Sequence, residues 1–465
     1  MAVNGTVVVS LIRGGERSPI VIGIVVSRAD PASIAIGDQL RALGNFEPVG
    51  DADRDRTFEL RTFEELHLEL EDVADQFDDP DLVVFVSRHA GETGPLLTAH
   101  IPGNVGAAEY GGRPRTVPRA APGALRTVYH ALCDHVPDGY DVGLECTHHG
   151  PSRVGAPCLF VEVGSDETNW RDPEAARGVA RAVLELEADT SDPDQVIVGF
   201  GGEHYVPRYE RIVRETGWAV GHVAADWALA ELADAEDRAA TIDSLFTQSG
   251  AAIAHVNTDQ DWVRPTIEEL GYRVVSERWL READGTDLAV VDRVVDLLGP
   301  IEEGTRIGDR GRVDPDDIEP CRLADQFVDL LNATDPERAR SCLDRRTTGY
   351  STVEGGSRVG PNIAVPPDVS WDALIDWFEP MIGDRFEEYE VTDGVIVGTT
   401  TRFDPAAARA CGVPEGPAFG RLAAGDPVTV DGTTVDPAEV HVTDRVTVPI
   451  VNGSAADAGG PVGEY

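Results

Sequence analysis

The sequence predicts an α/β domain with a largely parallel sheet, followed by a smaller α+β extension. Short apolar, β-branched runs alternate with helical segments over about the first 295 residues. This is the pattern of strands joined by crossover helices. Polar motifs follow directly after several of these strands, and ligands of open α/β sheets bind at the carboxyl ends of strands. We therefore expect the functional residues at the carboxyl ends of the strands.

The first part of the domain contains two predicted buried strands. Residues 20–27 (IVIGIVVS) form the first strand, and Asp30 is among the N-cap candidates of a helix that ends near residue 43. Residues 81–87 (DLVVFVS) form the second strand. The Gly- and Pro-rich segment 89–122 has few repeating apolar positions. A loop of this length is usually functional or disordered.

The alternation of helices and strands then continues as far as a Gly-Gly pair. The predicted elements are helices at 124–136 and 172–186 and strands at 140–146, 157–164 and 195–200. The second helix has the clearest start, because Asp172 is a good N-cap and Pro173 fits the first turn.

The domain boundaries follow from changes in composition. We expect an α/β domain at 1–298, a Gly-, Pro- and Asp-rich linker at 299–322, an α+β module at 323–450 and a flexible tail at 451–465. The module has helical stretches around 323–332 and 371–381, followed by short strands with Gly and Asp turns.

The charge composition excludes several chemistries. The chain carries 83 acidic and 39 basic residues, a net charge of −44, and every cation is arginine. Without lysine there is no Schiff base, pyridoxal phosphate anchor, Walker A loop or kinase site. Such acidity is typical of proteins from salt-loving archaea. The Debye length falls to about 3 Å in 1 M salt, so the charge does not exclude an RNA substrate.

Neither the cysteines nor the hydropathy indicates a secreted or membrane protein. The six cysteines form no CxxC pair, and a disulfide framework is not expected in so long a chain. No apolar run approaches the ~20 residues that cross a bilayer, and the start lacks a signal peptide pattern. We therefore expect a cytoplasmic protein without a membrane partner.

The histidines are concentrated in one part of the chain. Seven of the eleven lie between residues 89 and 204, and several follow predicted strands. Histidine and carboxylate are the ligands of catalytic zinc. The candidate ligands are His89, His100, His148, His149, Glu162 and His204. Glu162 alternates with apolar neighbours in FVEVG, and a buried carboxylate is costly unless it is paired or metal-bound.

Each of these histidines taken alone is more often a hydrogen-bonded structural residue. In the tandem pair, extended backbone points the two rings in different directions, so we expect only one of His148 and His149 to face the site. His67 lies in an acidic segment (EELHLELEDV) and is expected on a solvated face. The remaining histidines are expected to be structural or on the surface: His130, His135, His222, His255 and His441.

Nucleophilic catalysis fits the sequence less well. GxSxG is absent, and no GxGxxG follows the first strand. Cys146 and His148 share a face of an extended segment, although a buried, inert cysteine is the more frequent case.

Four ordered motifs together resemble one family. SRHAGETGPLLTAHIPGN, ECTHHGP, LFVEVGSDETNW and GGEHYVPR resemble the archaeal and plant type of D-aminoacyl-tRNA deacylase, and the resemblance covers roughly residues 20–290. The resemblance implies a fold of the phosphorylase/peptidyl-tRNA hydrolase group, which is a mixed sheet flanked by helices. It also implies zinc-dependent hydrolysis of the ester between a D-amino acid and the tRNA 3′ end, with residues 1–298 as the catalytic domain.

The resemblance assigns roles to the polar residues. One or two zinc ions per subunit would be bound by His89, His100, His148, Glu162 and His204. The catalytic candidates are Glu145, His149 and Asn104, with backbone N–H groups near Gly103-Asn104 or Gly201-Gly202 stabilising the oxyanion. The candidates for tRNA contact are Arg88, Arg153 and Arg208.

The sequence departs from the family pattern at two points, and it leaves alternatives open. Glu203 interrupts a run that is usually all glycine, and arginine must replace lysine at the phosphates. The alternatives are a zinc peptidase or amidohydrolase on a small amide, and a non-catalytic tRNA-binding protein. The expected partners are D-aminoacyl-tRNA and water, and a monomer is the working assumption.

Overall fold

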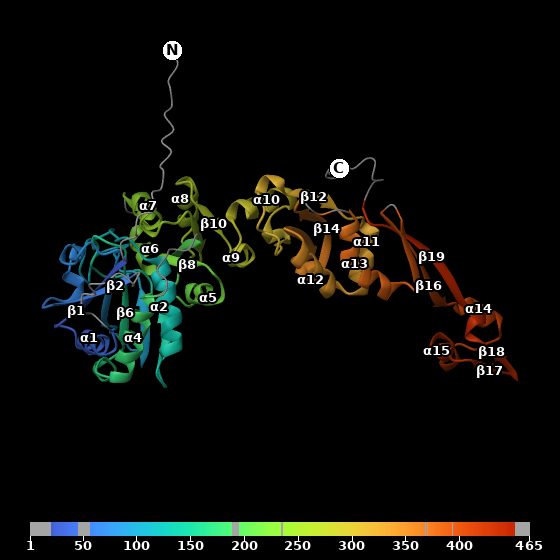
Figure 1. Ribbon diagram of the computed structural model, residues 1–465, viewed down its shortest axis with the longest axis horizontal. Coiled ribbons are helices and arrows are strands. Elements are labelled where there is room, and N and C mark those ends of the chain that lie inside the picture. The colour runs from blue at the N-terminus through green and yellow to red at the C-terminus, as the bar shows by residue number, and fades with distance from the viewer. Residues whose placement is uncertain are drawn as a thin grey trace, which may run out of the picture. The chain divides into compact units, whose positions relative to one another are not determined.

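The chain forms two compact units. The computed structural model describes residues 20–44, 56–187, 195–233, 236–367, 369, 371–392 and 394–451. Contacts group Met1–Leu280 into unit 1 and Arg281–Tyr465 into unit 2, and the division falls within helix α9 (Glu277–Ala283). Figure 1 shows the helices and strands along the chain.

A mixed sheet of six strands forms the first half of unit 1. The strands are β1 (Ile20–Ser27), β2 (Arg56–Phe63), β3 (Leu82–Arg88), β4 (Leu96–His100), β5 (Asp141–Leu144) and β6 (Cys158–Gly164). Their order is β2-β1-β3-β6-β4-β5, and neighbours are parallel except for β4 and β6. The predicted α/β fold with a mixed sheet is therefore confirmed.

A parallel sheet of four strands forms the second half of unit 1. The strands are β7 (Val196–Phe200), β8 (Ala219–Ala224), β9 (Ile253–Val256) and β10 (Arg273–Val275), in the order β10-β9-β7-β8. The segment after β5 joins the two sheets, because Cys146 N–H donates to His204 O at 2.9 Å and Thr147 N–H donates to Val223 O at 2.8 Å.

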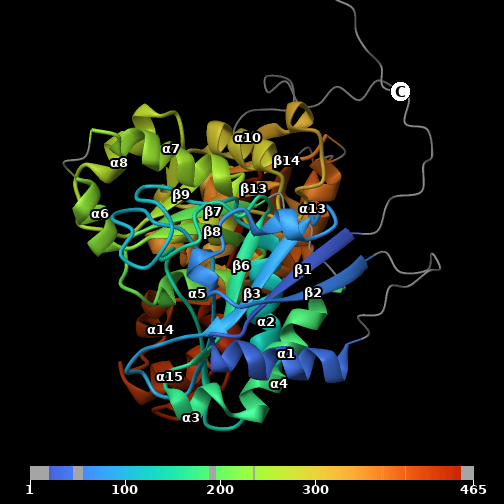
Figure 2. The ribbon, with the colours of Figure 1, turned by 90° about the vertical axis from the view of Figure 1, so that its left-hand side faces the viewer.

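Helices cover one face of the six-stranded sheet. The described helices of unit 1 before α9 are α1 (Pro31–Leu43), α2 (Pro122–His135), α3 (Glu167–Trp170), α4 (Pro173–Leu184), α5 (Pro207–Glu215), α6 (Asp226–Leu232), α7 (Arg238–Ser249) and α8 (Val263–Glu269). Of these, α1, α2 and α4 pack together against the sheet (Figure 2). As the sequence predicts, Asp172 caps α4 by accepting the Glu174 N–H at 2.9 Å.

On the face of this sheet opposite these helices, aromatic residues of β3 and β6 lie next to residues of the polar motifs. Phe85 of β3 and Phe160 of β6 stack with ring centroids 4.5 Å apart, and Phe77 packs against the same cluster. In the register, His100 pairs with Phe160 and Thr98 pairs with Glu162. Directly paired residues share a face, so along β6 this face changes from the aromatic Phe160 to the ionisable Glu162.

Unit 2 is α+β and built on antiparallel sheets. One sheet has the order β11-β13-β14-β12 and another the order β15-β16-β19, with a separate β17-β18 hairpin. Those strands are β11 (Thr305–Ile307), β12 (Glu319–Arg322), β13 (Gly349–Val353), β14 (Arg358–Val365), β15 (Glu388–Thr392), β16 (Val395–Phe403), β17 (Val428–Val430), β18 (Thr433–Val435) and β19 (His441–Pro449).

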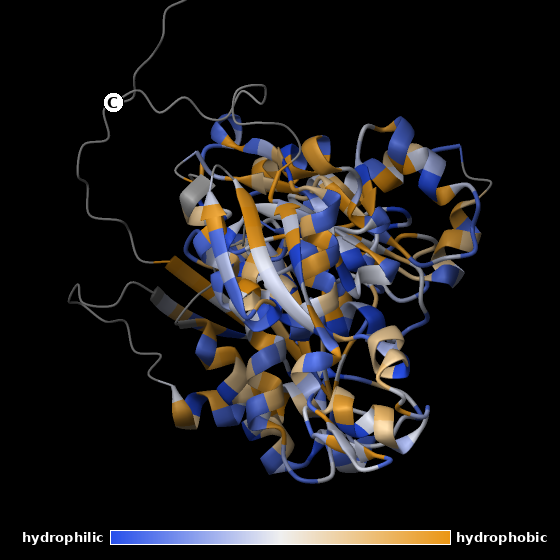
Figure 3. Ribbon diagram, turned by 90° about the vertical axis from the view of Figure 1, so that its right-hand side faces the viewer, coloured by the Kyte–Doolittle hydropathy of each residue, from blue (hydrophilic) through white to orange (hydrophobic). Residues whose placement is uncertain are grey.

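The helices of unit 2 are amphipathic. They are α10 (Leu288–Leu298), α11 (Asp325–Thr334), α12 (Pro336–Arg346), α13 (Trp371–Arg385), α14 (Pro405–Ala410) and α15 (Pro417–Ala423). Hydrophobic and hydrophilic residues alternate along the helices in Figure 3. No helix in the described ranges has both the length and the apolar character needed to cross a membrane.

The structure differs from the predicted segmentation in three places. The expected linker 299–322 contains β11 and β12, which belong to the four-stranded sheet of unit 2. The segment 89–122 contains β4, whose run of five residues lies between Gly-Pro-rich stretches and is too short to show a clear period. The division between the units falls after Leu280, whereas the sequence places the domain end at 298. Helix α10 accounts for this, because Val290 and Val294 pack against Ile318 and Ala364 of unit 2. The expected tail, 451–465, lies outside the described residues apart from residue 451.

Candidate active site

A cleft of about 670 Å³ in unit 1 gathers most of the predicted site residues. Its wall contains Arg88, His89, Asn104, His148, His149, Glu162 and His204. Several of these residues come together because each follows the end of a strand. His89 follows β3, the tandem pair follows β5, and His204 follows β7. Two further predicted residues, Glu145 and His100, are buried and contact the residues of the wall.

Glu145 is the centre of the cluster. Its Oε1 lies 3.1 Å from His89 Nδ1, and its Oε2 lies 3.0 Å from His204 Nε2, 3.5 Å from His148 Nε2 and 4.0 Å from His100 Nδ1. The side chain is fully buried, and neither oxygen has a hydrogen-bond partner in the described part of the chain. Burial raises the pKa of Glu145, but His204 and His89 outweigh burial and hold this pKa well below its ordinary value. Glu145 is therefore a buried, charged carboxylate.

Glu162 is a second buried carboxylate, and its pKa is shifted upward, whereas that of Glu145 is shifted downward. Burial raises its pKa to about 7. The Ser87 hydroxyl donates to Glu162 Oε1 at 2.6 Å, and Oε2 lies 3.6 Å from His89 Nδ1. The site thus holds one carboxylate that stays charged and one that exchanges its proton near neutral pH.

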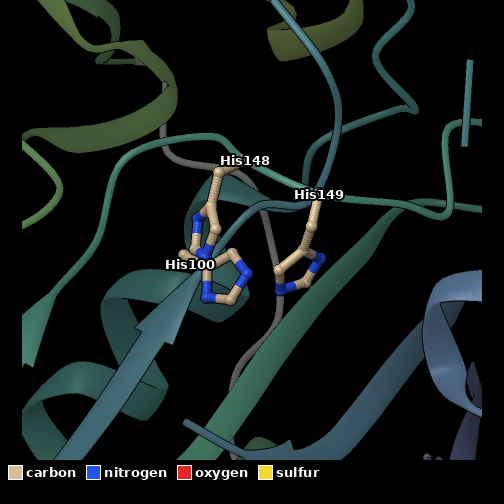
Figure 4. A group of neighbouring side chains, drawn as sticks. All are labelled: His100, His148 and His149. Atoms are coloured by element: carbon tan, nitrogen blue, oxygen red, sulfur yellow. The ribbon is translucent and has the colours of Figure 1, made fainter. Parts of the chain in front are cut away.

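Three histidine rings meet beside these carboxylates. The ring centroids of His100 and His148 are 4.4 Å apart, and each ring also lies within 4.9 Å of His149 (Figure 4). Burial lowers the pKa of His148 to about 4 and lowers the pKa values of His100 and His149 well below 6.5. The three rings are therefore neutral at neutral pH, which is the form that binds metal.

Both members of the tandem pair lie at the site, contrary to the expectation that only one would. His149 has a φ of 48°, which is uncommon for a residue other than glycine. This left-handed residue breaks the alternation of extended backbone, so the His149 ring turns back toward His148. The conformation is held by the bond from Gly103 N–H to His149 O, at 2.7 Å.

His89 has both ring nitrogens in contact with side chains. Nε2 lies 2.6 Å from the Tyr205 hydroxyl, which in turn lies 3.1 Å from Thr93 Oγ1. Burial lowers the pKa of His89, but Glu145 and Glu162 together raise it to about 11. Sequence reasoning did not single out Tyr205, although it stands next to His204 in the GGEHYVPR motif.

The expected oxyanion donors are already engaged. Gly103 N–H donates to His149 O, and Asn104 N–H donates to Thr116 O at 3.0 Å. Gly201 N–H donates to Ala224 O, and Gly202 N–H donates to Asp226 Oδ2 at 3.1 Å. The Asn104 side chain, which lines the cleft, donates to Gly111 O at 2.9 Å. Asn104 therefore acts here as a support of the loop.

The three arginines proposed for tRNA contact lie in different surroundings. Arg88 lines the cleft with its guanidinium 5.2 Å from the centre of the Trp170 ring. Arg153 forms an ion pair with Asp72, and Arg208 pairs with Glu277 at 3.1 Å. Two of the three cations are thus partly neutralised within the protein.

His67 is not on a solvated face as the sequence suggested. It lies in a short 3₁₀ segment (His67–Glu69), is 2% exposed and lines the cleft. Its Nε2 lies 3.2 Å from Ser33 Oγ, and burial lowers its pKa to about 4. Glu64, Glu65 and Glu69 are exposed, while the His67 ring packs inward against Phe85 and Phe160.

The cluster contains donor atoms suited to a metal ion, and several of these atoms have no hydrogen-bond partner among the described residues. Sets of three donors with ligand atoms within 4.8 Å of one another are His100-His148-His149, Cys146-His148-His204, His89-Glu145-His204 and His100-Glu145-Glu162. Both ring nitrogens of His100 and both oxygens of Glu145 lack a hydrogen-bond partner among the described residues. Unpaired buried polar atoms are rare, and nitrogen and oxygen donors of this kind suit zinc.

Comparison with known proteins agrees with the site. Residues 76–275 match the family model for D-aminoacyl-tRNA deacylase. The D-aminoacyl-tRNA deacylase of Natronomonas pharaonis is 43% identical over 90% of this chain and 98% of its own length. That of Halobacterium salinarum is 44% identical over 91% of this chain and 94% of its own.

One solved structure shares the fold. The crystal structure of AF0625, a conserved protein of unknown function, aligns with a TM-score of 0.51 and 26% identity, over 58% of this chain and 99% of AF0625. The family match and the near full-length relatives lead to one conclusion: the chain belongs to the D-aminoacyl-tRNA deacylase family.

Proposed function

We propose that this protein hydrolyses the ester bond of D-aminoacyl-tRNA, releasing the free D-amino acid and tRNA, with zinc bound in the cluster around Glu145. The observation that supports this most strongly is the buried Glu145 carboxylate, surrounded by histidines yet without a hydrogen-bond partner in the described chain. The names of the relatives supply the substrate class.

Two separate groups of donors support a site for one or two zinc ions. His100, His148 and His149 would hold one ion, and His89, Glu145 and His204 would hold another, since the two groups share no residue. A zinc ion bound there supplies Lewis-acid polarisation of water or of a carbonyl. The neutral state of the first three rings and the charge of Glu145 match what zinc requires of its ligands. His89, whose pKa the two carboxylates raise to about 11, would have to release a proton in order to bind zinc in the second group.

Glu162 is the residue placed to move a proton in this proposal. It lines the cleft, and its pKa of about 7 suits a general base at neutral pH. Ser87 occupies Oε1, so Oε2 is the atom that would take the proton from an attacking water. The buried Glu145 would bind and orient, and the Tyr205 hydroxyl would fix the His89 ring between the two carboxylates.

The Glu145→Gln variant tests the proposal. Replacing this buried carboxylate with an amide should lower the zinc content and slow hydrolysis of D-tyrosyl-tRNA in molar KCl by about 100-fold or more. Atomic absorption gives the zinc content, and the loss of acid-precipitable labelled D-tyrosine gives the rate. His135→Gln is the matched control, because His135 pairs with Glu185 on the surface of α2 and has no role in the cleft. His135→Gln should match the wild type in both measurements.

Other outcomes identify the alternative functions. If the zinc-loaded wild type cleaves small peptides or amides and leaves D-tyrosyl-tRNA intact, the protein is an amidohydrolase. If it binds tRNA tightly without metal and without hydrolysis, it is a tRNA-binding protein. Either result contradicts the proposed function.

A further inference from the structure

Two exposed aromatic side chains line the cleft. In the described parts of the chain, the exposed large hydrophobic residues are Ile34, Leu43, Tyr110, Trp227, Val353, Val442 and Val446. Only Tyr110 and Trp227 are aromatic, with 68% and 46% of their surface exposed, and both belong to the cleft wall. Other exposed apolar residues are aliphatic and lie outside this wall.

Neither ring is engaged by another aromatic ring or by a cation of the residues that the structure describes. Neither takes part in a ring–ring or cation–π contact with the described residues, and the Tyr110 hydroxyl makes no hydrogen bond with them. By contrast, Trp170 and Trp262 each lie under an arginine. An exposed aromatic ring without a partner costs solvation free energy, and such rings mark binding sites when they gather at a cleft.

The backbone holds both rings next to the segments that carry the histidines. Gly150 N–H donates to Tyr110 O at 2.9 Å, directly after His149. Trp227 follows Asp226 at the start of α6, and Asp226 accepts the Gly202 N–H of the turn that leads to His204. Ala107 N–H also donates to the Glu231 carboxylate of α6 at 2.8 Å. This hydrogen bond connects the segment before Tyr110 to the helix that carries Trp227. The rings are therefore positioned relative to the cluster, although their side chains are exposed.

We propose that Tyr110 and Trp227 form a stacking platform for the unpaired bases at the 3′ end of the tRNA. This inference rests on the proposed function. The ester is carried by the ribose of the terminal nucleotide, so an ester carbonyl at the cluster brings the terminal bases to the wall of the same cleft. Aromatic side chains bind unpaired bases by stacking, which accepts any base because each has a π-face.

The charge of the protein favours stacking over phosphate contacts. Arg153 and Arg208 are paired with carboxylates, and Glu109 and Glu231 line the cleft beside the rings. Contacts between arginine and phosphate lose affinity steeply as salt rises, and at about 1 M salt charges are screened beyond about 3 Å. A protein of net charge −44 thus gains most from contacts that do not depend on charge.

Binding of uncharged tRNA tests this platform separately from hydrolysis. Dissociation constants are measured in molar KCl for intact tRNA and for tRNA without its unpaired 3′ nucleotides. The wild type should bind intact tRNA about tenfold more tightly than trimmed tRNA. Tyr110→Ala and Trp227→Ala should each weaken binding of intact tRNA by about tenfold, the order typical of one stacked base. Tyr110→Phe and Trp227→Phe retain a ring and should bind as the wild type does.

Kinetics provide a second measurement with a surface control. The alanine variants should raise KM for D-tyrosyl-tRNA with kcat little changed, because stacking holds ground state and transition state alike. Hydrolysis of D-tyrosine ethyl ester, which has no base, should not change. Ile34→Ala on α1 removes an exposed apolar side chain outside the cleft and should alter none of these values.

The outcomes separate this inference from the proposed function. Equal binding of intact and trimmed tRNA by the wild type, or alanine variants that bind intact tRNA normally, would overturn the platform even if the wild type is an active deacylase. Conversely, a wild type without deacylase activity that still prefers intact tRNA through these two rings would overturn the proposed function and leave the platform standing.

Discussion

At the scale of single residues, Glu145 is a buried carboxylate that carries a large electrostatic cost. A buried charged carboxylate without hydrogen bonds is unfavourable by several kcal/mol unless it is paired or coordinates a metal. His89, whose pKa the two carboxylates raise to about 11, pairs with Glu145 as a cation but is shared with Glu162, and burial keeps the rings of His100, His148 and His149 neutral. A bound cation offsets this cost directly, which is why we place zinc in this cluster.

His222 is a buried histidine whose two ring nitrogens both have hydrogen-bond partners. Val223 N–H donates to Thr147 Oγ1 at 3.0 Å, so this hydroxyl donates in turn to His222 Nδ1, also at 3.0 Å. Nε2 of the same ring lies 2.9 Å from Pro118 O and donates to it. The network fixes the neutral ring in one tautomer, and burial lowers the pKa of His222 to about 4.

The low pKa of His222 predicts a loss of stability in acid. The folded-state pKa lies below the ordinary value of 6.5, so between pH 6.5 and about 4 the unfolded chain binds a proton that the folded chain does not. The stabilisation present above pH 6.5 therefore declines as the pH falls toward 4. Between pH 7 and 4.5 this residue alone should cost about 2 kcal/mol in free energy of unfolding.

Denaturant unfolding at constant molar KCl measures this effect. His222→Gln should be less stable than the wild type at pH 7, but its free energy of unfolding should fall by about 2 kcal/mol less between pH 7 and 4.5. An identical pH dependence in the two proteins would contradict the assignment of the neutral ring.

At the scale of elements, close backbone contacts between two loops hold the tandem histidines. Gly112 has a φ of 76°, and a Cβ there would lie 2.4 Å from Ser152 Oγ and 2.7 Å from Asn104 Nδ2. The same Cβ would lie 3.1 Å from Gly150 Cα, the residue after His149. Only glycine allows the loop around residues 103–112 to approach the segment 148–152 this closely.

Gly112→Ala should therefore impair the site as well as the fold. We expect a loss of about 2–4 kcal/mol in the free energy of unfolding, from left-handed strain and overpacking together, and a lower kcat as the segment carrying His149 shifts. Gly139→Ala is the matched control, because Gly139 has a φ of 85° but open space around its Cβ position. It should cost only about 1 kcal/mol and leave kcat unchanged. Equal losses in both variants would mean that the close approach is unimportant.

The strands and helices of the six-stranded sheet were largely predictable. The runs at 20–27, 81–87 and 157–164 correspond to β1, β3 and β6 within one residue at each end, because long β-branched runs and clear caps leave few alternatives. β2 and the short β4 were missed, and the reversed direction of β4 depends on contacts with β6 that no local pattern encodes.

The residues that belong to the site could be predicted better than the way in which they are arranged. Residues that follow parallel strands had to converge, and His89, His148 and His204 do so. The left-handed turn at His149, the burial of His67 and the contact of Tyr205 with His89 depend on packing between loops. Likewise, only the folded chain shows that the backbone N–H groups of Gly103 and Gly201 are already engaged.

At the scale of the whole molecule, every candidate metal ligand found among the described residues belongs to unit 1. AF0625 aligns over 99% of its own length with 58% of this chain, so a protein of about that size can stand alone with a similar fold. The haloarchaeal relatives in turn match 90% or more of the chain. Unit 2 is thus shared with those relatives and contributes no residue to the candidate metal sets.

A fragment ending at Gly285, just beyond α9, should bind zinc with the stoichiometry of the full chain. Its cores around Phe85 and Phe246 are complete without unit 2. Zinc content and circular dichroism in molar KCl are the measurements, with the same fragment carrying Glu145→Gln as the control. A folded fragment that binds less zinc than the full chain would show that unit 2 contributes to the metal site.

The most direct test of the account is the hydrolysis of matched D- and L-tyrosyl-tRNA in molar KCl, with and without a chelator. We expect rapid loss of the D form, little loss of the L form, and restoration of activity when zinc is returned after chelation. Hydrolysis of both forms at the rate of buffer by a protein that retains stoichiometric zinc would contradict it.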